Sequence, residues 1–236
     1  MKVTIIGSGR AGQSFALALG RVGHEVTLIH HDQLESVTGE FVLLSVPDDA
    51  LAEVAAAIAP DASRVLAHAA GSRTLEVLAP HPRVASLHPL AALSSPERGA
   101  ERLVGATYCV AGDDAALEIV RSLDGRVITL DDARRTLYHA TATVAANHLV
   151  ALMGQVERLA TEVGLELEDF LALAGQALTD VASDGPAMAL TGPASRGDVE
   201  TIDAHLAAMP EVERPAYVAL AHAAFELAEQ RRVAHA

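Results

Sequence analysis

The sequence predicts an α/β protein in which an N-terminal doubly wound parallel sheet is followed by an all-α C-terminal domain. In the first half, short β-rich runs alternate with helical stretches, and Gly, Pro or Asp closes most of these runs. After residue 130 the β-branched runs cease, and long segments rich in Ala, Leu and Glu follow. Half of the 236 residues are hydrophobic, so the chain can bury a substantial core. We therefore expect two domains, over residues 1–130 and 131–236.

The candidate strands are six β-rich runs in the first half: VTIIG (3–7), EVTLIH (25–30), FVLLSV (41–46), SRVLAH (63–68), RVASLH (83–88) and TYCVAG (107–112). The candidate helices of the second half cover roughly residues 131–164, 167–182, 198–208 and 213–234. Asp131 and Asp132 are candidate N-caps for the first of these helices, and Gly164 is a candidate for its C-terminal end.

The composition argues against several classes of protein. A formal net charge of −14 and a pI near 5.1 disfavour nucleic-acid binding, which needs a concentrated basic surface. No apolar run approaches the roughly 18 to 20 residues that span a bilayer, and Met1 leads into a strand instead of a signal peptide. The single cysteine, Cys109, lacks a partner for an internal disulfide, which agrees with a reducing compartment. We expect a cytoplasmic protein that binds neither nucleic acid nor membrane.

A glycine motif, GSGRAG, follows the first predicted strand and opens a helical run. Its GxGxxG spacing in this position is typical of a dinucleotide-binding loop. Gly7 permits the tight turn, Gly9 lets the backbone approach a pyrophosphate, and Gly12 allows close helix packing, while the helix N-terminus attracts phosphates. The cofactor-binding residues predicted here are Gly7, Ser8, Gly9, Arg10, Ala11 and Gly12.

The end of the second predicted strand bears on the choice between NAD and NADP. An acid at this point grips the ribose hydroxyl of NAD and would repel the 2′-phosphate of NADP. The strand ends instead in His30 and His31, and Arg10 lies in the glycine loop. We therefore expect both histidines to contact the cofactor and favour NADP(H), while Asp32 keeps NAD open. A third ligand at suitable spacing is missing, so we expect no metal site.

Three further strand ends carry residues that we expect at one edge of the sheet, where α/β sheets bind ligands. Val46, Pro47 and Asp48 follow the third strand and are predicted to line the nicotinamide half of the cofactor. His68 and His88 end the next two strands. For each histidine a functional role and a plain loop or core position with a hydrogen-bond partner are equally open.

The stretch LYHATATVAANHLV, residues 137–150, predicts a helix with a polar stripe. His139, Thr143 and Asn147 recur every fourth residue and therefore share one face. His139 can serve as a general acid near neutral pH, and the Asn147 amide can polarise the same substrate oxygen. The alternative is that these two residues satisfy each other or cap nearby backbone. The residues that we predict as catalytic are His139, Asn147 and His88, and Thr143 and His68 are predicted to bind substrate.

A second segment, LTGPASRGD, contains a candidate site for a carboxylate substrate. Arg196 lies between a Gly-Pro turn and a predicted helix start. A bidentate clamp on a substrate carboxylate and an ion pair with Asp198 or Glu200 are equally good interpretations of this arginine.

Taken together, the motifs resemble a known family over nearly the whole chain. They are GSGRAG, VLLSVPDDAL, AHAAGS, SLHPL, YHATATVAANH and ALTGPASRGDVETIDAHL. They are similar to bacterial Rossmann-like proteins with an all-helical C-terminal domain of largely unassigned function, in the 6-phosphogluconate-dehydrogenase-like superfamily. The resemblance implies an NADP-binding Rossmann domain over residues 1–130 and a helical substrate and dimerisation domain over 131–236. Because some members are thought to act as alternative ketopantoate reductases, it also implies NADPH-dependent reduction of a small 2-oxo acid such as ketopantoate (2-dehydropantoate).

The sequence departs from better-known relatives in one chemical respect. Common ketopantoate reductases and β-hydroxyacid dehydrogenases use a lysine four residues before an asparagine on the interdomain helix. Here that residue is Thr143, four before Asn147, and the single lysine of the chain is Lys2. Either the general acid or the reaction is therefore different.

Three other functions stay open on the sequence. Reduction of a cyclic imine of the pyrroline-5-carboxylate type needs little acid catalysis, which fits the lack of lysine. A deazaflavin-linked NADP reductase is a further alternative. An NADP(H)-binding sensor without catalytic activity is the alternative outside the enzymes. In each case the Ala-rich helical domain favours a homodimer.

Overall fold

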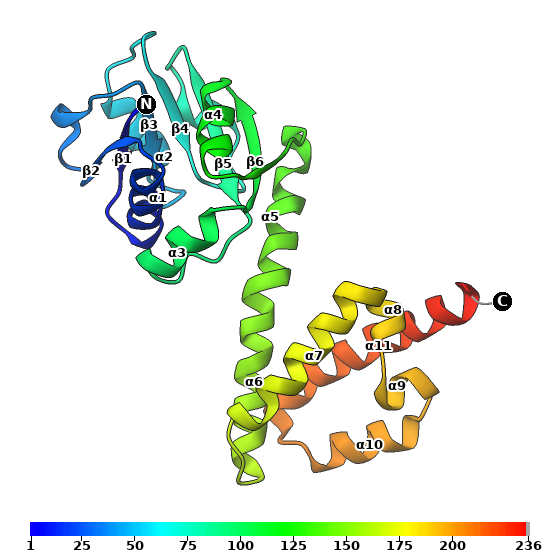
Figure 1. The fold of residues 1–236 in the computed structure, drawn as a ribbon. Helices are drawn as coiled ribbons and strands as arrows, with labels where there is room; N and C mark the ends of the chain where they lie inside the picture. The colour runs from blue at the N-terminus through cyan, green and yellow to red at the C-terminus, as the bar shows by residue number, and fades with distance from the viewer. Residues whose placement is uncertain (235–236) are drawn as a thin grey trace. The chain divides into compact units, whose positions relative to one another are not determined.

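The computed structural model describes residues 1–234 and contains two compact units, Met1–Asn147 and His148–Ala236 (Figure 1). Each unit is described by itself below. The change from strands to helices comes after residue 128, close to the position predicted. The division into compact units comes later, after Asn147, so the domain boundary at residue 130 stays a prediction.

The N-terminal unit is built on a seven-stranded sheet with the order β2-β1-β3-β4-β5-β6-β7 (Figure 1). Its strands are β1 (Lys2–Ile6), β2 (Glu25–Ile29), β3 (Phe41–Leu44), β4 (Val65–His68), β5 (Val84–Pro89), β6 (Thr107–Gly112) and β7 (Arg126–Ile128). The first five strands pair in parallel, which confirms the predicted doubly wound α/β architecture. One strand departs from the parallel arrangement, because β6 runs antiparallel to β5. The sequence analysis also missed β7, a three-residue strand.

Both faces of the sheet are covered, as the continuous apolar runs require. On β3, Phe41 and Leu43 belong to one buried cluster, and Val42 and Leu44 belong to the other. The first cluster packs against α1 (Arg10–Arg21), α3 (Pro96–Leu103) and α4 (Ala115–Ser122). The second packs against α2 (Leu51–Ala57) and the short helix η2 (Leu75–Leu78).

A long helical stretch follows the sheet. It consists of η3 (Asp132–Arg134), α5 (Arg135–Thr143), the π-helical turn η4 (Val144–His148) and α6 (Leu149–Glu162). Asp131 lies at the N-cap position of η3, as predicted, although its side chain makes no capping hydrogen bond within the described residues. The Asp132 carboxylate, the other candidate cap, instead accepts from Arg135. Gly164 lies just past the end of α6 at φ 73°, as a C-terminal glycine should.

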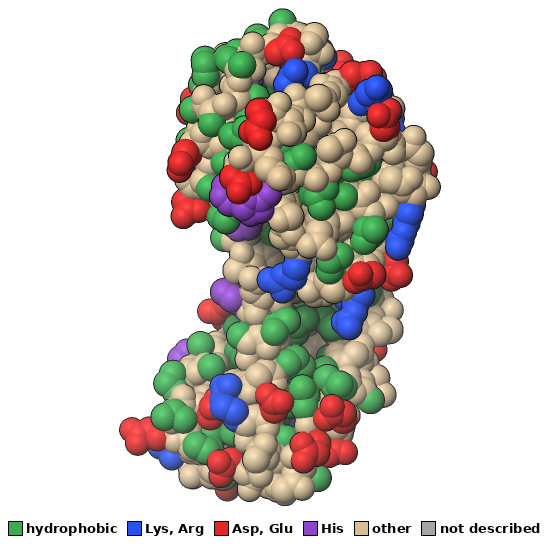
Figure 2. Space-filling model, turned by 90° about the vertical axis from the view of Figure 1, so that its left-hand side faces the viewer, with side chains coloured by type: hydrophobic (Ala, Val, Ile, Leu, Met, Phe, Trp, Pro, Cys, Tyr) green, Lys and Arg blue, Asp and Glu red, His purple; other side chains and the backbone are tan. Residues whose placement is uncertain are grey.

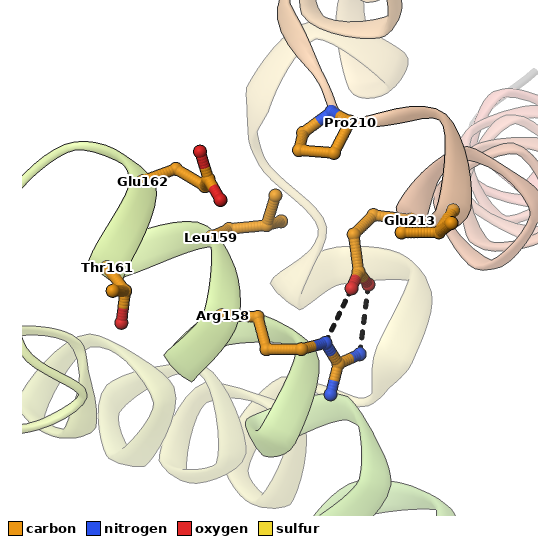
Figure 3. Close-up of a pocket in the computed structure, with 7 residues that line it drawn as sticks. Arg158, Leu159, Thr161, Glu162, Pro210 and Glu213 are labelled. Atoms are coloured by element: carbon orange, nitrogen blue, oxygen red, sulfur yellow. Dashed lines mark hydrogen bonds and ion pairs between the residues drawn. The ribbon is translucent and has the colours of Figure 1, made fainter.

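The C-terminal unit is entirely helical in its described residues, as predicted. Its helices after α6 are α7 (Glu168–Asp184), α8 (Pro186–Ala189), α9 (Gly192–Arg196), α10 (Val199–Ala208), η5 (Glu211–Glu213) and α11 (Arg214–Ala234). An ion pair ties α6 to η5: Arg158 donates to both carboxylate oxygens of the nearly buried Glu213, at 2.5 and 2.9 Å (Figure 3). Gln155, which lies on α6 like Arg158, donates to the backbone carbonyl of Glu213. These bonds satisfy the polar groups beside a cavity of about 300 Å³, so we regard them as structural.

Residues 1–234 contain no helix both long and apolar enough to cross a membrane. The same residues contain no group of three or more His, Cys, Asp or Glu side chains placed to hold a metal ion.

Candidate active site

The glycine loop lies at the carboxyl end of β1, between the strand and α1. Gly7 has φ 111°, and a Cβ there would lie 2.4 Å from the Ser45 carbonyl oxygen. A Cβ on Gly12 would lie 1.8 Å from the carbonyl oxygen of Gly7. A Cβ on Gly9, in contrast, would meet no described atom within 4 Å. The first and third glycines are therefore needed for packing, whereas the second leaves open space above the backbone.

The N-terminus of α1 is available to an anion. Gln13 N–H makes the first helical bond, to Gly9 C=O, so the earlier N–H groups lack helical acceptors. The first turn of α1 contains no acidic side chain, and Arg10 is exposed beside it. The Ser45 hydroxyl is buried close to this loop and lacks a hydrogen-bond partner among residues 1–234. Each of these features favours a phosphate-bearing ligand at this position.

The loop after β3 contacts the loops that follow β1 and β4 at the same edge of the sheet. A Cβ on Gly7 would lie 3.2 Å from a methyl carbon of Val46, so this loop adjoins the glycine loop. Pro47 leads on to Asp48, whose carboxylate accepts from the Ser72 hydroxyl at 2.9 Å and pairs with Arg73 at 3.7 Å. The residues predicted after β1 and β3 are thus brought together, and the loop after β4 joins them.

The histidines after β2 pair with the acid that follows them. His30 Nδ1 and an Asp32 carboxylate oxygen are 2.8 Å apart, and the rings of His30 and His31 are in contact, with centroids 4.1 Å apart. The hydrogen bond from His30 lowers the pKa of Asp32. Figure 2 shows histidine side chains gathered beside acidic ones on the surface of the N-terminal unit. This strand end therefore carries a carboxylate as well as two imidazoles.

His68 ends β4 and is completely buried. Its Nδ1 accepts a hydrogen bond from the Ala70 N–H at 3.2 Å. Burial, and then the charge of Arg135, lower the pKa of His68 to about 4, so its ring is neutral at physiological pH. The side chain has no exposed surface in this structure, and its role in substrate binding stays a prediction.

His88 and His139 converge on one glycine. A Cβ on Gly71 would lie 2.8 Å from His88 Nε2 and 2.7 Å from His139 Nδ1. On its other side, His88 Nδ1 lies 2.8 Å from the hydroxyl oxygen of Tyr138. Burial and the neighbouring His139 lower the pKa of His88 to about 4, so this ring too is neutral. The strand end of β5 and the helix α5 thus meet at a loop where a side chain at residue 71 would have to displace the two imidazole rings.

A cavity of about 450 Å³ opens beside these two histidines. Its polar lining consists of the four residues His88, His139, Thr143 and Asn147. The remaining wall is supplied by Pro89–Ala92 and by alanines of α5 and η4. The predicted stripe therefore lines one cavity, although the π-helical turn at Val144–His148 breaks the regular helical step on which the prediction was based.

A buried arginine lies beneath the histidines. Arg135, the first residue of α5, donates to Ser86 on β5 at 2.9 Å and to Asp132 at 2.8 Å. Burial raises the pKa of Tyr138 to about 12, and the Arg135 charge acts in the opposite direction. Because Arg135 is completely buried, it orients the start of α5 and does not reach the cavity.

Arg196 lies in the C-terminal unit at the end of α9. Its guanidinium is 3.8 Å from an Asp198 carboxylate oxygen, a long and largely exposed ion pair. This contact matches the ion-pair interpretation, and the carboxylate clamp stays a prediction. Asp198 itself caps α10 by accepting from the Thr201 N–H.

Four residues of this site were not predicted from the sequence: Gly71, Ser72, Arg135 and Tyr138. The segment AHAAGSR offered a signal for the first two, because a glycine after a strand end often marks a close approach. The other two offered none, because an arginine and a tyrosine near a helix start are ordinary surface residues until the sheet buries them.

The chain matches a family model described as a domain of unknown function (DUF2520) over residues 106–224, just over half of its length. The chain belongs to this family. Membership confirms the resemblance to a family whose function is unassigned. No protein of curated function matches the sequence.

Solved structures share the fold over nearly the whole chain. A candidate NADP oxidoreductase from Bacteroides fragilis is 23% identical, with 95% of this chain and 98% of that chain covered and a TM-score of 0.80. A protein from Thermotoga maritima is 21% identical, with 98% and 99% covered and a TM-score of 0.76. The pyrroline carboxylate reductase of Plasmodium falciparum, solved with NADP bound, is 11% identical, with 97% and 98% covered and a TM-score of 0.62. At these identities the likeness demonstrates the fold alone.

Proposed function

We propose that this protein is an NADPH-dependent oxidoreductase that reduces a small 2-oxo acid, of the ketopantoate reductase type. The observation that carries the proposal is the continuous series of contacts along one edge of the sheet. Gly7 adjoins Val46, and Asp48 binds Ser72. The residue before Ser72, Gly71, lies so close to His88 and His139 that a Cβ there would meet both imidazoles. A dinucleotide site and a polar cavity are thus joined by consecutive loops, as a hydride-transfer site requires.

The residues present fit a dinucleotide. The open space above Gly9, the free N-terminus of α1 and the unpartnered hydroxyl of Ser45 suit a pyrophosphate. In our proposal Val46, Pro47 and Asp48 hold the nicotinamide half of the cofactor. A reductive aminase from Aspergillus terreus, which has a similar fold, was solved in complex with NADPH.

A preference for NADP(H) rests on the charges around the adenosine end. Arg10 is exposed at the start of α1 and would pair with a 2′-phosphate. The Asp32 carboxylate is engaged by His30 Nδ1 at 2.8 Å. Without that pairing, Asp32 would favour the ribose hydroxyl of NAD.

When bound, NADPH would supply the hydride. The carbonyl oxygen then develops negative charge, and in our proposal His139 donates a proton to it while the Asn147 amide donates a hydrogen bond. Thr143 lines the same cavity and would orient the substrate. His88, held by Tyr138, adds a second imidazole at the closed end of the site. In this proposal the imidazole of His139 takes the role that a lysine has in the better-known relatives.

Reduction of a cyclic imine is the second candidate, favoured by the absence of a lysine other than Lys2. An iminium substrate already carries its proton, so the polar groups of the cavity would only orient it. Pyrroline carboxylate reductases from two organisms share the fold. For either substrate, a carboxylate clamp by Arg196 belongs to the same proposal.

We also propose that the protein is a homodimer that associates through its helical unit. In the described chain none of the 17 residues of α7 is buried, yet the helix carries Leu171, Leu173, Leu178 and Val181. Figure 2 shows hydrophobic side chains exposed over much of the visible surface of this unit. So much exposed apolar surface is typical of an interface, and a second copy offers the same surface in return.

The function is tested by the consumption of NADPH, followed by absorbance, with a panel of 2-oxo acids, cyclic imines and a deazaflavin. The proposal expects turnover with 2-oxo acids of the ketopantoate type. Turnover with cyclic imines alone supports the second candidate. Tight NADPH binding without turnover of any compound would instead identify a sensor, which the sequence analysis left open.

A further inference from the structure

The cavity beside His88 and His139 has a lining without formally charged side chains. All of its lining residues lie within Met1–Asn147, and none of these described residues is Lys, Arg, Asp or Glu. Burial, and then the neighbouring His139, lower the pKa of His88 to about 4, so its ring adds no charge at physiological pH. The proton that His139 supplies in the proposed reaction goes to the carbonyl oxygen. The lining therefore offers no counter-charge to any other part of a substrate.

Two charged groups act on His88 from outside the lining, and both are engaged elsewhere. Asp48 and Arg135 influence the pKa of His88, and neither lines the cavity. The Asp48 carboxylate accepts from the Ser72 hydroxyl and pairs with Arg73. Arg135 is completely buried. An ionised group placed in the cavity would thus lose part of its hydration without gaining an ion pair.

Alanines make up much of the remaining wall, on two separate segments. Ala91 and Ala92 lie in the irregular segment after β5, and Ala142, Ala145 and Ala146 lie on α5 and η4. The preference of alanine for helices accounts for the second group but not for the first. Side chains that end at Cβ leave a cavity of about 450 Å³, within the range of about 300–1,000 Å³ that is typical of ligand pockets. Such a volume suits a ligand larger than a three-carbon oxo acid.

Ala142 is the alanine best placed to control this space. It follows His139 by three residues on the regular part of α5, so the two side chains share one face, with Cβ atoms roughly 5–6 Å apart. Both residues are half-buried, whereas Ala145 and Ala146 are exposed. A substrate whose carbonyl oxygen meets His139 therefore places its next carbon atoms beside Ala142.

We propose that the cavity selects a 2-oxo acid whose side chain is uncharged and branched, and that Ala142 is a specificity-determining residue that leaves room for the branch. The inference rests on the proposed function, because it takes His139 as the group that meets the carbonyl. The carboxylate of the substrate is held outside the cavity. Small oxo acids such as pyruvate leave the space unfilled, and dicarboxylic ones such as 2-oxoglutarate place a second charge in an uncharged lining.

The selectivity can be measured without turnover when NADP⁺ replaces NADPH. The oxidised cofactor has no hydride to give, so an oxo acid added to the full-length protein with NADP⁺ binds without reacting. In titration calorimetry, 3-methyl-2-oxobutanoate should bind about a hundredfold more tightly than pyruvate, since each missing methyl group costs about tenfold. 2-Oxoglutarate should bind no more tightly than pyruvate. Equal affinities for the three acids, tightest binding of 2-oxoglutarate, or no binding of any of them would overturn the proposal.

Two variants test Ala142 itself. Ala142→Leu fills the space and should lower kcat/KM for 3-methyl-2-oxobutanoate about tenfold, with little change for pyruvate. Ala142→Arg adds a cation and should raise kcat/KM for 2-oxoglutarate, relative to 3-methyl-2-oxobutanoate, by about tenfold or more. Ala140→Leu, at an exposed position of α5 that does not line the cavity, is the matched control and should leave all three values unchanged. If Ala142→Leu changes the values for all three acids equally, or none of them, Ala142 serves only the helix.

Binding and turnover together separate this proposal from the proposed function. The expected order of affinities with NADP⁺, without consumption of NADPH by any of the acids, would refute the reductase and support the selectivity of the cavity. Turnover of pyruvate and 3-methyl-2-oxobutanoate with similar kcat/KM would support the reductase and refute the selectivity.

Discussion

Acid should destabilise the N-terminal unit through a single buried histidine. His68 is completely buried, and its pKa is lowered from 6.5 to about 4 by burial and by Arg135, while Asp48 acts in the opposite direction. In the unfolded chain the pKa returns to 6.5. Between these values the unfolded state binds more protons than the folded state, so the free energy of unfolding rises with pH. The stabilisation is complete above pH 6.5 and is lost as the pH falls toward 4.

The magnitude follows from the two pKa values. Their difference corresponds to about 3.4 kcal/mol once the pH is below both, and to about 2 kcal/mol at pH 5. Protonation of Nδ1 would place an N–H against the Ala70 N–H that it now accepts from, which gives the penalty a local cause. His88 contributes in the same direction, reduced by its partial exposure.

Urea unfolding at pH 7.5 and at pH 5.0 measures this effect, followed by far-ultraviolet circular dichroism because the chain contains no Trp. His68→Asn keeps an acceptor for the Ala70 N–H but cannot titrate. We expect the variant to lose about 2 kcal/mol less than the wild type between the two pH values. His222→Asn, at an exposed position on α11, is the control and should follow the wild type. An equal pH dependence in His68→Asn and the wild type would refute the reasoning.

Four further predictions concern the candidate site. Arg10→Ala should reduce a preference for NADPH over NADH, measured by titration of cofactor fluorescence, and equal affinities in the wild type would remove the basis of that preference. His139→Ala should lower kcat by about a hundredfold or more with nearly unchanged NADPH affinity, since acid catalysis commonly contributes 10² to 10⁴; a loss of affinity instead would indicate a structural residue. Gly71→Ala should lower kcat, because the new Cβ would meet two imidazole nitrogens. The NADPH dissociation constant should stay unchanged, because the φ of residue 71 is not left-handed and alanine can adopt it. A fully active variant would contradict the crowding at residue 71. Arg196→Ala should raise the substrate KM by about tenfold to a hundredfold if the arginine clamps a carboxylate, whereas an unchanged KM with a lower melting temperature would indicate only the ion pair with Asp198.

The dimer is tested by analytical ultracentrifugation. Leu173→Glu places a charge in the exposed apolar face of α7 and should shift the protein toward monomer. Val104→Glu, in the N-terminal unit, is a matched control with an exposed valine and should leave the mass unchanged. A monomeric wild type would contradict the interface.

The sequence by itself determined the architecture, because the alternation of strands and helices and the change after residue 130 are local patterns of hydrophobicity. It also determined the loop GSGRAG, in which glycines serve needs set by backbone sterics at a strand-to-helix turn. The direction of β6, in contrast, could not be predicted from the local sequence. Its run TYCVAG has the composition of a buried strand in either direction, and only pairing with β5 decides between them.

Only the tertiary structure determined the burial and the contacts of each histidine. His68 and His88 end adjacent strands and look alike in the sequence, yet one is completely buried and the other faces a cavity. Arg135 and Tyr138 became part of the site because α5 packs its first turn against β5, a contact between segments about fifty residues apart. Burial and the proximity of charges depend on such distant contacts, and these two properties set pKa values. The sequence therefore predicted which chemistry is present, whereas packing determined which histidines line the cavity.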